Sequence, residues 1–431
     1  MRYIYVDNYR GIRDSLIPLS EVNFLVGENS TGKTSLLNAI SLICNPVFWM
    51  DPVHALSSIA GHSFFDTISD KKNFSIGHVL FGKNKLGGWR CDFMLNEFRS
   101  VAGRIAFSRH RRFFSEDGDK GAYTEIKFAS RTASFTYVPV ERKLSSEEDA
   151  KTFFHDCLGG KLVNSPLTSF PKGLAADTPL PILASLAKGS SGPKENKMHE
   201  LHFEIIQPEH VRSIAPIRSR PFKIYDGAPI GHSPSGEHIP NKLRDEHEKR
   251  SEFSEELKKF GQNSGLFDQL KVHSYENSAR APFELLVKVN NSYRNICDVG
   301  YGVSQSLPVA VELLMDRQGG AFLMQQPEVH LHPRAQAALG DLVFSVATQK
   351  KSSFFIETHS DYLIDRFRVA LKKTSAPKNK RPKAQVLFFE HEDESNKVHS
   401  LEISFDGRYP ESQPDSFRKF FINESFSLLE I

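Results

Sequence analysis

The segment "GENSTGKT" constrains the fold of this chain more than any other stretch. It fits the pattern G-x-x-x-x-G-K-[ST] at Gly27, Gly32, Lys33 and Thr34. The apolar run "VNFLV" precedes it, and the amphipathic run "SLLNAISLI" follows it. Because a phosphate-binding loop joins a buried strand to the N-terminus of a helix, these neighbours argue against a chance match. The sequence therefore predicts a strand–loop–helix unit that binds a nucleotide.

The residue types in this loop suit a triphosphate and its magnesium ion. Glycines let backbone N–H groups approach an anion closely, and the helix N-terminus adds positive potential. We expect Lys33 to reach the β- and γ-phosphates and the Thr34 hydroxyl to bind Mg²⁺, so ATP and Mg²⁺ are the expected cofactors. Three further expected contacts come from the same loop and the first helical turn, namely Ser30, Thr31 and Ser35.

Composition is that of an ordinary globular protein. The 431 residues, 39% apolar and 25% charged, allow one large domain with insertions or two to three domains. The chain has no run of 18 apolar residues, no signal-peptide core and no CxxC pair among its four cysteines, so we expect a cytoplasmic protein with reduced thiols. A net charge of +3 neither requires nor excludes a nucleic-acid partner.

Hydrophobic patterning divides the chain into three stretches. Residues 1–45 carry the loop, and residues 46–204 contain runs typical of a mostly antiparallel sheet, with a helix at 145–158. Residues 205–431 alternate strands and helices from "FELLVKV" onward, which predicts a parallel α/β core. The charged segment 241–261 is expected to be a solvated helix.

Other segments are expected at the surface. Composition predicts a loop at 187–197, a long Pro- and Gly-rich loop at 220–243 and a basic loop at 374–383. No sustained heptad repeat is present, so long coiled-coil arms are not expected.

Three short pieces in the last stretch follow one another in order. "DVGYGVSQSLP" is a glycine-containing turn that opens a helix, and alone it could equally be a structural cap. "FLMQQPEVHLHP" ends a strand and enters a turn. "FFIETHSDYLI" is a strand that ends near a histidine and is followed by a helix.

Together with "NYRGI…VNFLVGENSTGKTSLLNAI", these pieces resemble the ATP-binding-cassette (ABC) type of head in structural-maintenance-of-chromosomes (SMC) and overcoming-lysogenization-defect (OLD) family ATPases. "IAPIRSRPFKIY" and "DGRYPESQPDSFRKFFINE" are similar to stretches of stand-alone, AAA15-like OLD ATPases of bacterial defence loci. The resemblance covers about 1–45 and 205–425 and is thin between 45 and 200. It implies an α/β P-loop NTPase head of the ABC type, with a mixed sheet, flanking helices and an inserted β-rich and helical region. It also implies that two subunits enclose two ATP molecules, so that ATP is partly an assembly ligand.

The resemblance implies roles near the phosphates of ATP. Arg10 and Asn29 would lie beside the phosphates of their own subunit. The segment "GYGVSQ" would be the signature segment and would contact the γ-phosphate held by a second subunit. Its expected contact residues are Gly302, Ser304 and Gln305.

Two glutamines stand where acids are usual in such heads. Gln325 occupies the position of the Mg²⁺-associated acid, and Gln326 that of the water-activating glutamate. Glutamine lacks the charge and basicity of glutamate, and a general base typically contributes about 10²–10⁴-fold in rate. Glu328 could partly substitute. We therefore expect ATP binding and dimerisation to persist while hydrolysis is slow.

The origin of these glutamines has two explanations. Variants that read EQPE and QQPE occur among OLD-like ATPases, which favours native residues. An introduced Glu→Gln replacement at 326, made to trap ATP, is the alternative.

Three histidines have two readings. By resemblance, His332 would lie in the loop that crosses the dimer interface, and His359 would face the γ-phosphate. Alternatively, His330, His332 and His359 could bind zinc as an HxH pair with a distant histidine. No nearby Asp, Glu or Cys set completes such a site, and no cysteine or serine has partners that would make it a nucleophile.

The segment "SRHRRFF" has the composition of a nucleic-acid contact. Arginines beside aromatic rings suit phosphates and stacked bases. A solvated surface is the commoner explanation for such charge, and docking of a protein partner is a third. The three arginines are Arg109, Arg111 and Arg112.

Two hypotheses for function follow. The resemblance implies an ATP-binding sensor and scaffold that controls a separate effector, such as a nuclease, in anti-phage defence, as in Septu, PARIS and retron systems. The chain ends at Ile431 soon after the last expected strands, so we do not expect a Toprim nuclease domain within it. The alternative is a DNA repair or maintenance ATPase of the SMC class. A transporter subunit is disfavoured because the "LSGGQ" form of the signature is missing.

Overall fold

The computed structural model describes most of the chain, and the statements below concern the described residues. These are residues 2–60, 73–83, 89–101, 104–115, 120–128, 132–160, 168–171, 211–246, 251–276, 278, 280–316, 319–392 and 395–420. The expected loop at 187–197 lies outside them. Within the described part, no helix has both the length and the apolar character needed to span a bilayer.

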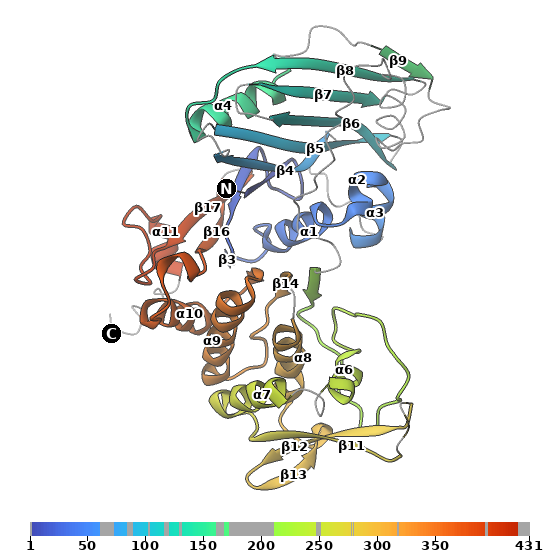
Figure 1. Ribbon diagram of the computed structural model, residues 1–431, viewed down its shortest axis with the longest axis vertical. Helices are drawn as coiled ribbons and strands as arrows, with labels where there is room; N and C mark the ends of the chain where they lie inside the picture. Colours follow the sequence, from blue (N-terminus) through green and yellow to red (C-terminus); the bar gives the residue numbers. More distant parts are fainter. Residues whose placement is uncertain are drawn as a thin grey trace. The chain divides into compact units, whose positions relative to one another are not determined.

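The chain folds into two compact units, each built from segments that are distant in the sequence (Figure 1). The first unit comprises Met1–Leu19, Asn29–Pro208 and Phe389–Val398. The second comprises Ser20–Glu28, Glu209–Phe388 and His399–Ile431.

The first unit is built on an eight-stranded sheet whose neighbouring strands all run antiparallel. This confirms the antiparallel sheet expected from the sequence, although β2 had not been recognised. In spatial order the strands are β2 (Ser15–Leu19), β1 (Arg2–Asp7), β4 (Phe74–Lys83), β5 (Trp89–Val101), β6 (Arg104–Ser115), β7 (Lys120–Phe128), β8 (Thr132–Glu141) and β9 (Thr168–Pro171).

Helix α4 (Glu147–Leu158) packs against one face of this sheet and confirms the helix predicted at 145–158. The Ser146 side chain caps its N-terminus by accepting the N–H of Asp149 at 3.1 Å. Phe153 and Phe154 are buried against the aromatic side chains of the sheet. Burial of two Phe rings supplies most of the apolar contact that holds this helix in place.

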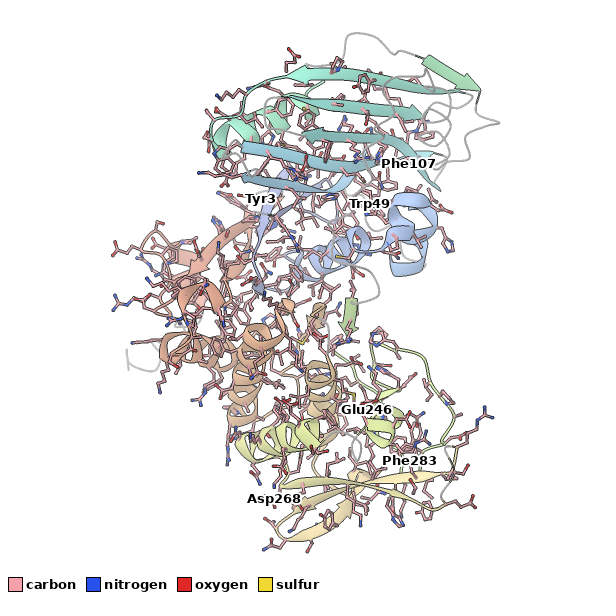
Figure 2. All side chains as sticks on the ribbon, viewed as in Figure 1. Tyr3, Trp49, Phe107, Glu246, Asp268 and Phe283 are labelled. Atoms are coloured by element: carbon pink, nitrogen blue, oxygen red, sulfur yellow. The ribbon has the colours of Figure 1, made fainter. Side chains whose placement is uncertain are left out.

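The first unit also contains three further helices, α1 (Lys33–Ile43), α2 (Pro46–Met50) and α3 (Pro52–Ala60). The apolar face of α1 is buried, as its amphipathic pattern predicts. Trp49, labelled in Figure 2, lies on α2 and donates its indole N–H to the carbonyl of Ile43 at 2.9 Å.

A six-stranded sheet carries the second unit. Its first four strands, β10 (Val211–Ile214), β14 (Ala321–Gln325), β15 (Ser353–Glu357) and β3 (Val22–Gly27), are parallel, and β16 (Ala384–Glu392) and β17 (Ser395–Ile403) follow beyond β3. Apart from Val211 at the start of β10, the apolar side chains of the four parallel strands are buried, as expected for a sheet covered on both faces. Their carboxyl ends meet at one edge, which is where open α/β sheets bind ligands.

Helices flank this sheet, and a second, three-stranded sheet lies in the same unit (Figure 1). The helices are α6 (Ile239–Glu246), α7 (Ser251–Ser264), α8 (Tyr301–Met315), α9 (Pro333–Lys350), α10 (Asp361–Lys373) and α11 (Asp415–Phe420), with 3-10 turns η4 (Ile296–Asp298) and η5 (Lys378–Lys380). The small sheet is antiparallel and consists of β11 (Gln269–Ser274), β12 (Phe283–Val289) and β13 (Ser292–Asn295).

Two expectations for this unit were wrong. "FELLVKV" is β12 of the small antiparallel sheet and not a strand of the parallel core. The segment 241–261 is not a solvated helix, because Phe253, Leu257 and Phe260 of α7 are buried in the core. Its few apolar residues recur at i, i+4 and i+7, which is enough for one buried stripe.

Candidate nucleotide site

The phosphate loop (residues 27–34) leaves β3 at Gly27, and α1 begins at Lys33. Gly32 occupies the N-cap position with φ of 100°, a left-handed conformation that favours glycine. A Cβ at Gly32 would approach Cγ1 of Ile12 to 3.2 Å. Gly32 has no side chain to cap α1, so this helix start has the form of an anion-binding N-terminus.

The side chains of the loop differ in exposure in a way that suits their expected roles. Lys33 is only 4% exposed, and Thr31 and Ser35 are buried, whereas Asn29 and Thr34 are exposed. The exposed Thr34 hydroxyl can reach a metal ion. The exposed Asn29 can reach a ligand that approaches the outer side of the loop.

Arg10 lies in a tight turn between β1 and β2. Tyr9 and Ile12 exchange backbone hydrogen bonds of 3.0 and 3.1 Å across it, and Arg10 has φ of 49°. The Ile12 side chain lies beside Gly32. The turn that carries Arg10 therefore lies beside the end of the phosphate loop, and the contact of Arg10 with the phosphates stays a prediction.

The signature segment opens α8 in the second unit. Gly302 packs beside the carbonyl of His330, and the rings of Tyr301 and His330 lie 5.0 Å apart. The segment is therefore in contact with the turn after β14 (residues 326–332), although the two are separated in the sequence.

Two signature side chains do not have the exposure that the resemblance implied. Gln305 is 1% exposed, and the Ser304 hydroxyl donates to the carbonyl of Tyr301 at 2.9 Å. The structure therefore does not present Gln305 to a second subunit. The N-terminus of α8 is accessible to a ligand, because Tyr301 is exposed.

The turn after β14 holds the two glutamines at the carboxyl edge of the parallel sheet. Gln325 ends the strand, and Gln326 has φ of 43°, a left-handed conformation that is unfavourable for a residue with a side chain. The N–H of Gln326 donates to the carbonyl of Glu357 at 2.8 Å. The carbonyl of Gln326 accepts the N–H of Val329 at 3.2 Å. Both glutamines are partly exposed.

Glu328 has a defined partner at the same edge. One of its carboxylate oxygens accepts the backbone N–H of His359 at 2.8 Å, and the side chain is buried. Burial raises the pKa of Glu328, while the His359 N–H opposes that rise. This carboxylate holds the turn after β14 to the segment after β15.

Glu357 is a site residue that the sequence reasoning missed. It ends β15, lies opposite Gln325 in the parallel register and is 7% exposed. Because side chains alternate between the faces of a sheet, register partners share a face. A carboxylate therefore stands beside Gln325 even though Gln325 carries none, and the signal was the acid two residues before the histidine in "ETHS".

His332 and His359 are both exposed, as a role at an interface requires. His332 is the N-cap of α9, where its Nδ1 accepts the N–H of Arg334 at 3.4 Å. Among the described residues, His330, His332 and His359 do not bring ligand atoms together as a metal site would. The zinc reading of these three histidines is therefore wrong.

A different cluster brings His232, His238 and Glu312 together, with the three ligand atoms 2.5 to 3.6 Å apart. The backbone N–H of Ser233 donates to Nδ1 of His238, so the ring proton of a neutral His238 is on Nε2, facing Glu312. The Lys242 ammonium also contacts Glu312 at 2.9 Å. This geometry suits a hydrogen-bonded ion cluster better than a metal centre.

The pKa of Glu312 reflects two opposing effects. Burial alone would raise it, but hydrogen bonds from His232 and His238 and the charge of Lys242 together hold the pKa well below its usual range. Arg212 adds a contact of 3.6 Å to Glu312 and one of 3.2 Å to Asp316. The negative charges of Glu312 and Asp316 are thus paired with the positive charges of Lys242 and Arg212 within the second unit.

The arginines of "SRHRRFF" are not a free basic surface. They lie on β6, where Arg111 contacts Glu97 and Glu125 at 3.3 Å each, and Arg109 contacts Glu125 at 3.6 Å. Arg112 is half-buried, and burial lowers its pKa. The expectation of solvated charge, or of a nucleic-acid contact through Arg109 and Arg111, is corrected by this pairing within the sheet.

Comparison with known families supports the ATPase assignment. A family model described as "AAA ATPase domain" matches residues 1–134. A second, described as an AAA domain and named after the AbiEii toxin of a type IV toxin–antitoxin system, matches residues 211–365. The chain carries AAA-type ATPase domains. The two matches contain the phosphate loop and the turn after β14, respectively, and with the sheet topology they confirm the predicted α/β P-loop ATPase fold.

Solved structures with similarity to the chain include SMC heads. One is an SMC head bound to the C-terminal winged-helix domain of ScpA, with 12% identity, 93% of this chain and 98% of that chain covered, and a TM-score of 0.42. Another is the SMC head domain from Thermotoga maritima, with 11% identity, 94% and 100% coverage, and a TM-score of 0.36. At these TM-scores the likeness carries no argument about function. No curated protein matches the chain significantly.

Proposed function

We propose that this protein binds ATP with Mg²⁺, dimerises around the nucleotide and hydrolyses it slowly. The observation that carries the proposal is the phosphate loop, where a left-handed Gly32 leads into a helix that begins at a buried Lys33. A helix N-terminus and a lysine are together suited to the β- and γ-phosphates. The exposed Thr34 is the proposed protein ligand of Mg²⁺.

Slow hydrolysis follows from the chemistry at the carboxyl edge of the sheet. Neither Gln325 nor Gln326 can accept a proton from an attacking water, and Glu328 is engaged by the His359 N–H. Glu357 is the remaining carboxylate beside Gln325 and is the proposed acid of the site. We propose that ATP binding is therefore long-lived relative to its cleavage.

Dimerisation is proposed from the signature segment. Gly302 and Tyr301 lie at the start of α8 and contact the turn after β14, while His332 and His359 are exposed nearby in the chain's fold. In this arrangement the start of α8 would meet the γ-phosphate of a second subunit. ATP makes its full set of contacts only in the dimer, where both subunits touch it. Its binding therefore contributes to the free energy of dimerisation.

The proposed biological role is that of a sensor and scaffold for a separate effector, such as a nuclease, in anti-phage defence. The family model over residues 211–365 is named for a toxin of a toxin–antitoxin system, which favours this class. The exposed side chains Phe222, Ile224 and Ile230 line a cavity of about 500 Å³, which favours a protein partner.

The DNA-maintenance alternative is less supported. It came from the resemblance to SMC-class heads, and two of the three arginines that offered a nucleic-acid contact are paired with glutamates inside the sheet. ATPase activity that rises on addition of DNA would favour the alternative. The basic loop around η5 is the remaining candidate contact for DNA.

The experiment that tests the proposal is a comparison of native mass with and without ATP–Mg²⁺, for the wild-type chain and for Lys33→Ala. Co-expression with the products of neighbouring genes extends the same measurement to an effector. Wild type should gain mass with ATP and retain a neighbouring gene product, and Lys33→Ala should lose the ATP-dependent step.

A further inference from the structure

Arg218 is a buried arginine in the loop that follows β10. Its side chain is only 2% exposed, although arginine is almost never fully buried unless it is paired. It lies in the second unit, as do all the groups it contacts. No sequence motif assigns a role to Arg218, and the proposed chemistry of ATP does not use it directly.

The guanidinium of Arg218 joins two elements of the candidate site. Nη1 donates to the carbonyl of Gln305 in α8 at 2.8 Å, and Nη2 donates to the carbonyl of Gln326 at 2.8 Å. Longer bonds reach the carbonyls of Pro327 at 3.4 Å and Ala215 at 3.3 Å. One rigid planar group therefore connects the signature helix to the turn after β14.

The charge of Arg218 is kept inside the protein. Burial lowers its pKa to about 10, while the nearby Glu328 favours the charged form. The group is therefore cationic at neutral pH. A lysine could not reproduce the contacts, because its single ammonium cannot span carbonyls on two elements as a planar fork does.

Arg218 also explains why Gln326 keeps an unfavourable backbone conformation. The left-handed residue is held on one side by the bond from its N–H to the carbonyl of Glu357, and on the other by the bond from Arg218 to its carbonyl. Such conformations persist only where the surroundings fix them. Loss of Arg218 would leave the carbonyl of Gln326 with only the longer bond from the Val329 N–H, at 3.2 Å.

We propose that Arg218 is a positioning residue that couples the signature segment to the turn after β14. The inference rests on the proposed function, in which the turn faces the nucleotide of its own subunit and the signature segment faces that of the second subunit. Through Arg218 a shift of one element displaces the other, so occupancy of one nucleotide site biases the second.

The test compares Arg218→Lys with a matched control, Arg381→Lys. The Arg381 guanidinium also bonds backbone carbonyls, those of Ala376 at 2.7 Å and Thr374 at 3.0 Å, but it contacts neither element of the site. For each variant the Kd for a fluorescent ATP analogue with Mg²⁺, the ATP-dependent dimer dissociation constant, and kcat and KM are measured. Thermal unfolding is recorded for both.

Arg218→Lys should bind the analogue as wild type does, because the phosphate loop is intact. Its dimer dissociation constant should rise about 10-fold and its kcat should fall about 10-fold with KM unchanged, in the range of typical coupling between sites. Arg381→Lys should match wild type in analogue affinity, dimerisation and turnover, even if the loss of its own carbonyl bonds lowers its melting temperature. The inference is overturned if Arg218→Lys dimerises and turns over as wild type does, or if analogue affinity falls in step with the melting temperature, which would indicate a purely structural role.

A measurement on the wild-type chain keeps the inference testable if Arg218→Lys does not fold. Hydrogen exchange at residues 301–308 and 326–331 should slow together as ATP is added, with the same midpoint. Protection of only one segment contradicts the coupling. If wild type neither binds ATP nor dimerises, the proposed function fails instead, and it does so before any Arg218 variant is compared.

Discussion

Gln326 is the residue that we propose limits the rate of ATP hydrolysis. The Gln326→Glu variant places a base where a water-activating glutamate is usual. It adds no backbone strain, because glutamine and glutamate are equally unfavourable at φ of 43°. We expect hydrolysis to accelerate by about 10²-fold or more and the ATP-bound assembly to become shorter-lived. Phosphate release and the lifetime of the dimer are the measurements.

Gln326→Met is the matched control for this prediction. It keeps the length of the side chain without a base, so it should be no faster than wild type. If Gln326→Glu also leaves both the rate and the lifetime unchanged, Gln326 is not at the attacking water.

Glu357 is expected to supply the residual activity. Glu357→Gln removes the carboxylate beside Gln325, so kcat with Mg²⁺ should fall by about 10²-fold. Glu328→Gln is the comparison, since its carboxylate is already held by the His359 N–H, and it should reduce kcat less. Equal losses in the two variants would argue that Glu357 has no special role.

At this scale the sequence located the phosphate loop because its spacing reports local geometry directly. It could not locate Glu357 or Arg218, because their roles arise from register and from contacts between segments distant in the chain. The resemblance also assigned Gln305 to an interface, whereas the structure buries it. A short motif does not reveal which face of α8 is covered by its neighbours.

Helix α1 depends on the glycine that precedes it. Gly32→Ala adds a Cβ at φ of 100° and 3.2 Å from Ile12, so we expect a loss of about 1–2 kcal/mol in the free energy of unfolding, together with weaker ATP binding. Gly160→Ala is a matched control: Gly160 has φ of 72°, but a Cβ there meets nothing within 4 Å. It should lose similar stability and bind ATP normally, as urea unfolding and ATP titration would reveal. Normal ATP binding by Gly32→Ala would contradict the account of the loop.

Most elements of the chain were predictable, but their assignment to sheets was not. The strand pattern of β5 to β8 and the capped α4 are local signals, and both were confirmed. "FELLVKV" was placed in the wrong sheet, because the sequence of a buried strand has the same apolar pattern in a parallel sheet and in an antiparallel one. The apolar stripe of α7 was missed because three residues among many charges sufficed to bury it.

The ion cluster around Glu312 should make the stability of the whole chain depend on pH. The pKa of Glu312 is depressed in the folded state, so its contribution is present above the unfolded value of 4.5 and is lost as the pH falls through the folded value. Glu312→Gln removes the charged partner of Lys242 and of the buried His238, whereas Arg212 keeps its contact with Asp316, so the variant should cost about 1–3 kcal/mol at pH 7.

The measurement for this prediction is the free energy of unfolding of both proteins from pH 7 to pH 3. The difference between wild type and Glu312→Gln should be constant near neutrality and should shrink below about pH 4.5. A difference that grows on acidification would have the wrong sign for a depressed carboxyl pKa.

The assembly state with ATP tests the central claim most directly. Native mass is measured for the 48.7 kDa chain alone, with saturating ATP–Mg²⁺, and for Lys33→Ala under both conditions. We predict that ATP doubles the mass of the wild-type species and leaves Lys33→Ala unchanged. A wild-type mass that is the same with and without bound ATP would contradict the proposal that this protein dimerises around its nucleotide.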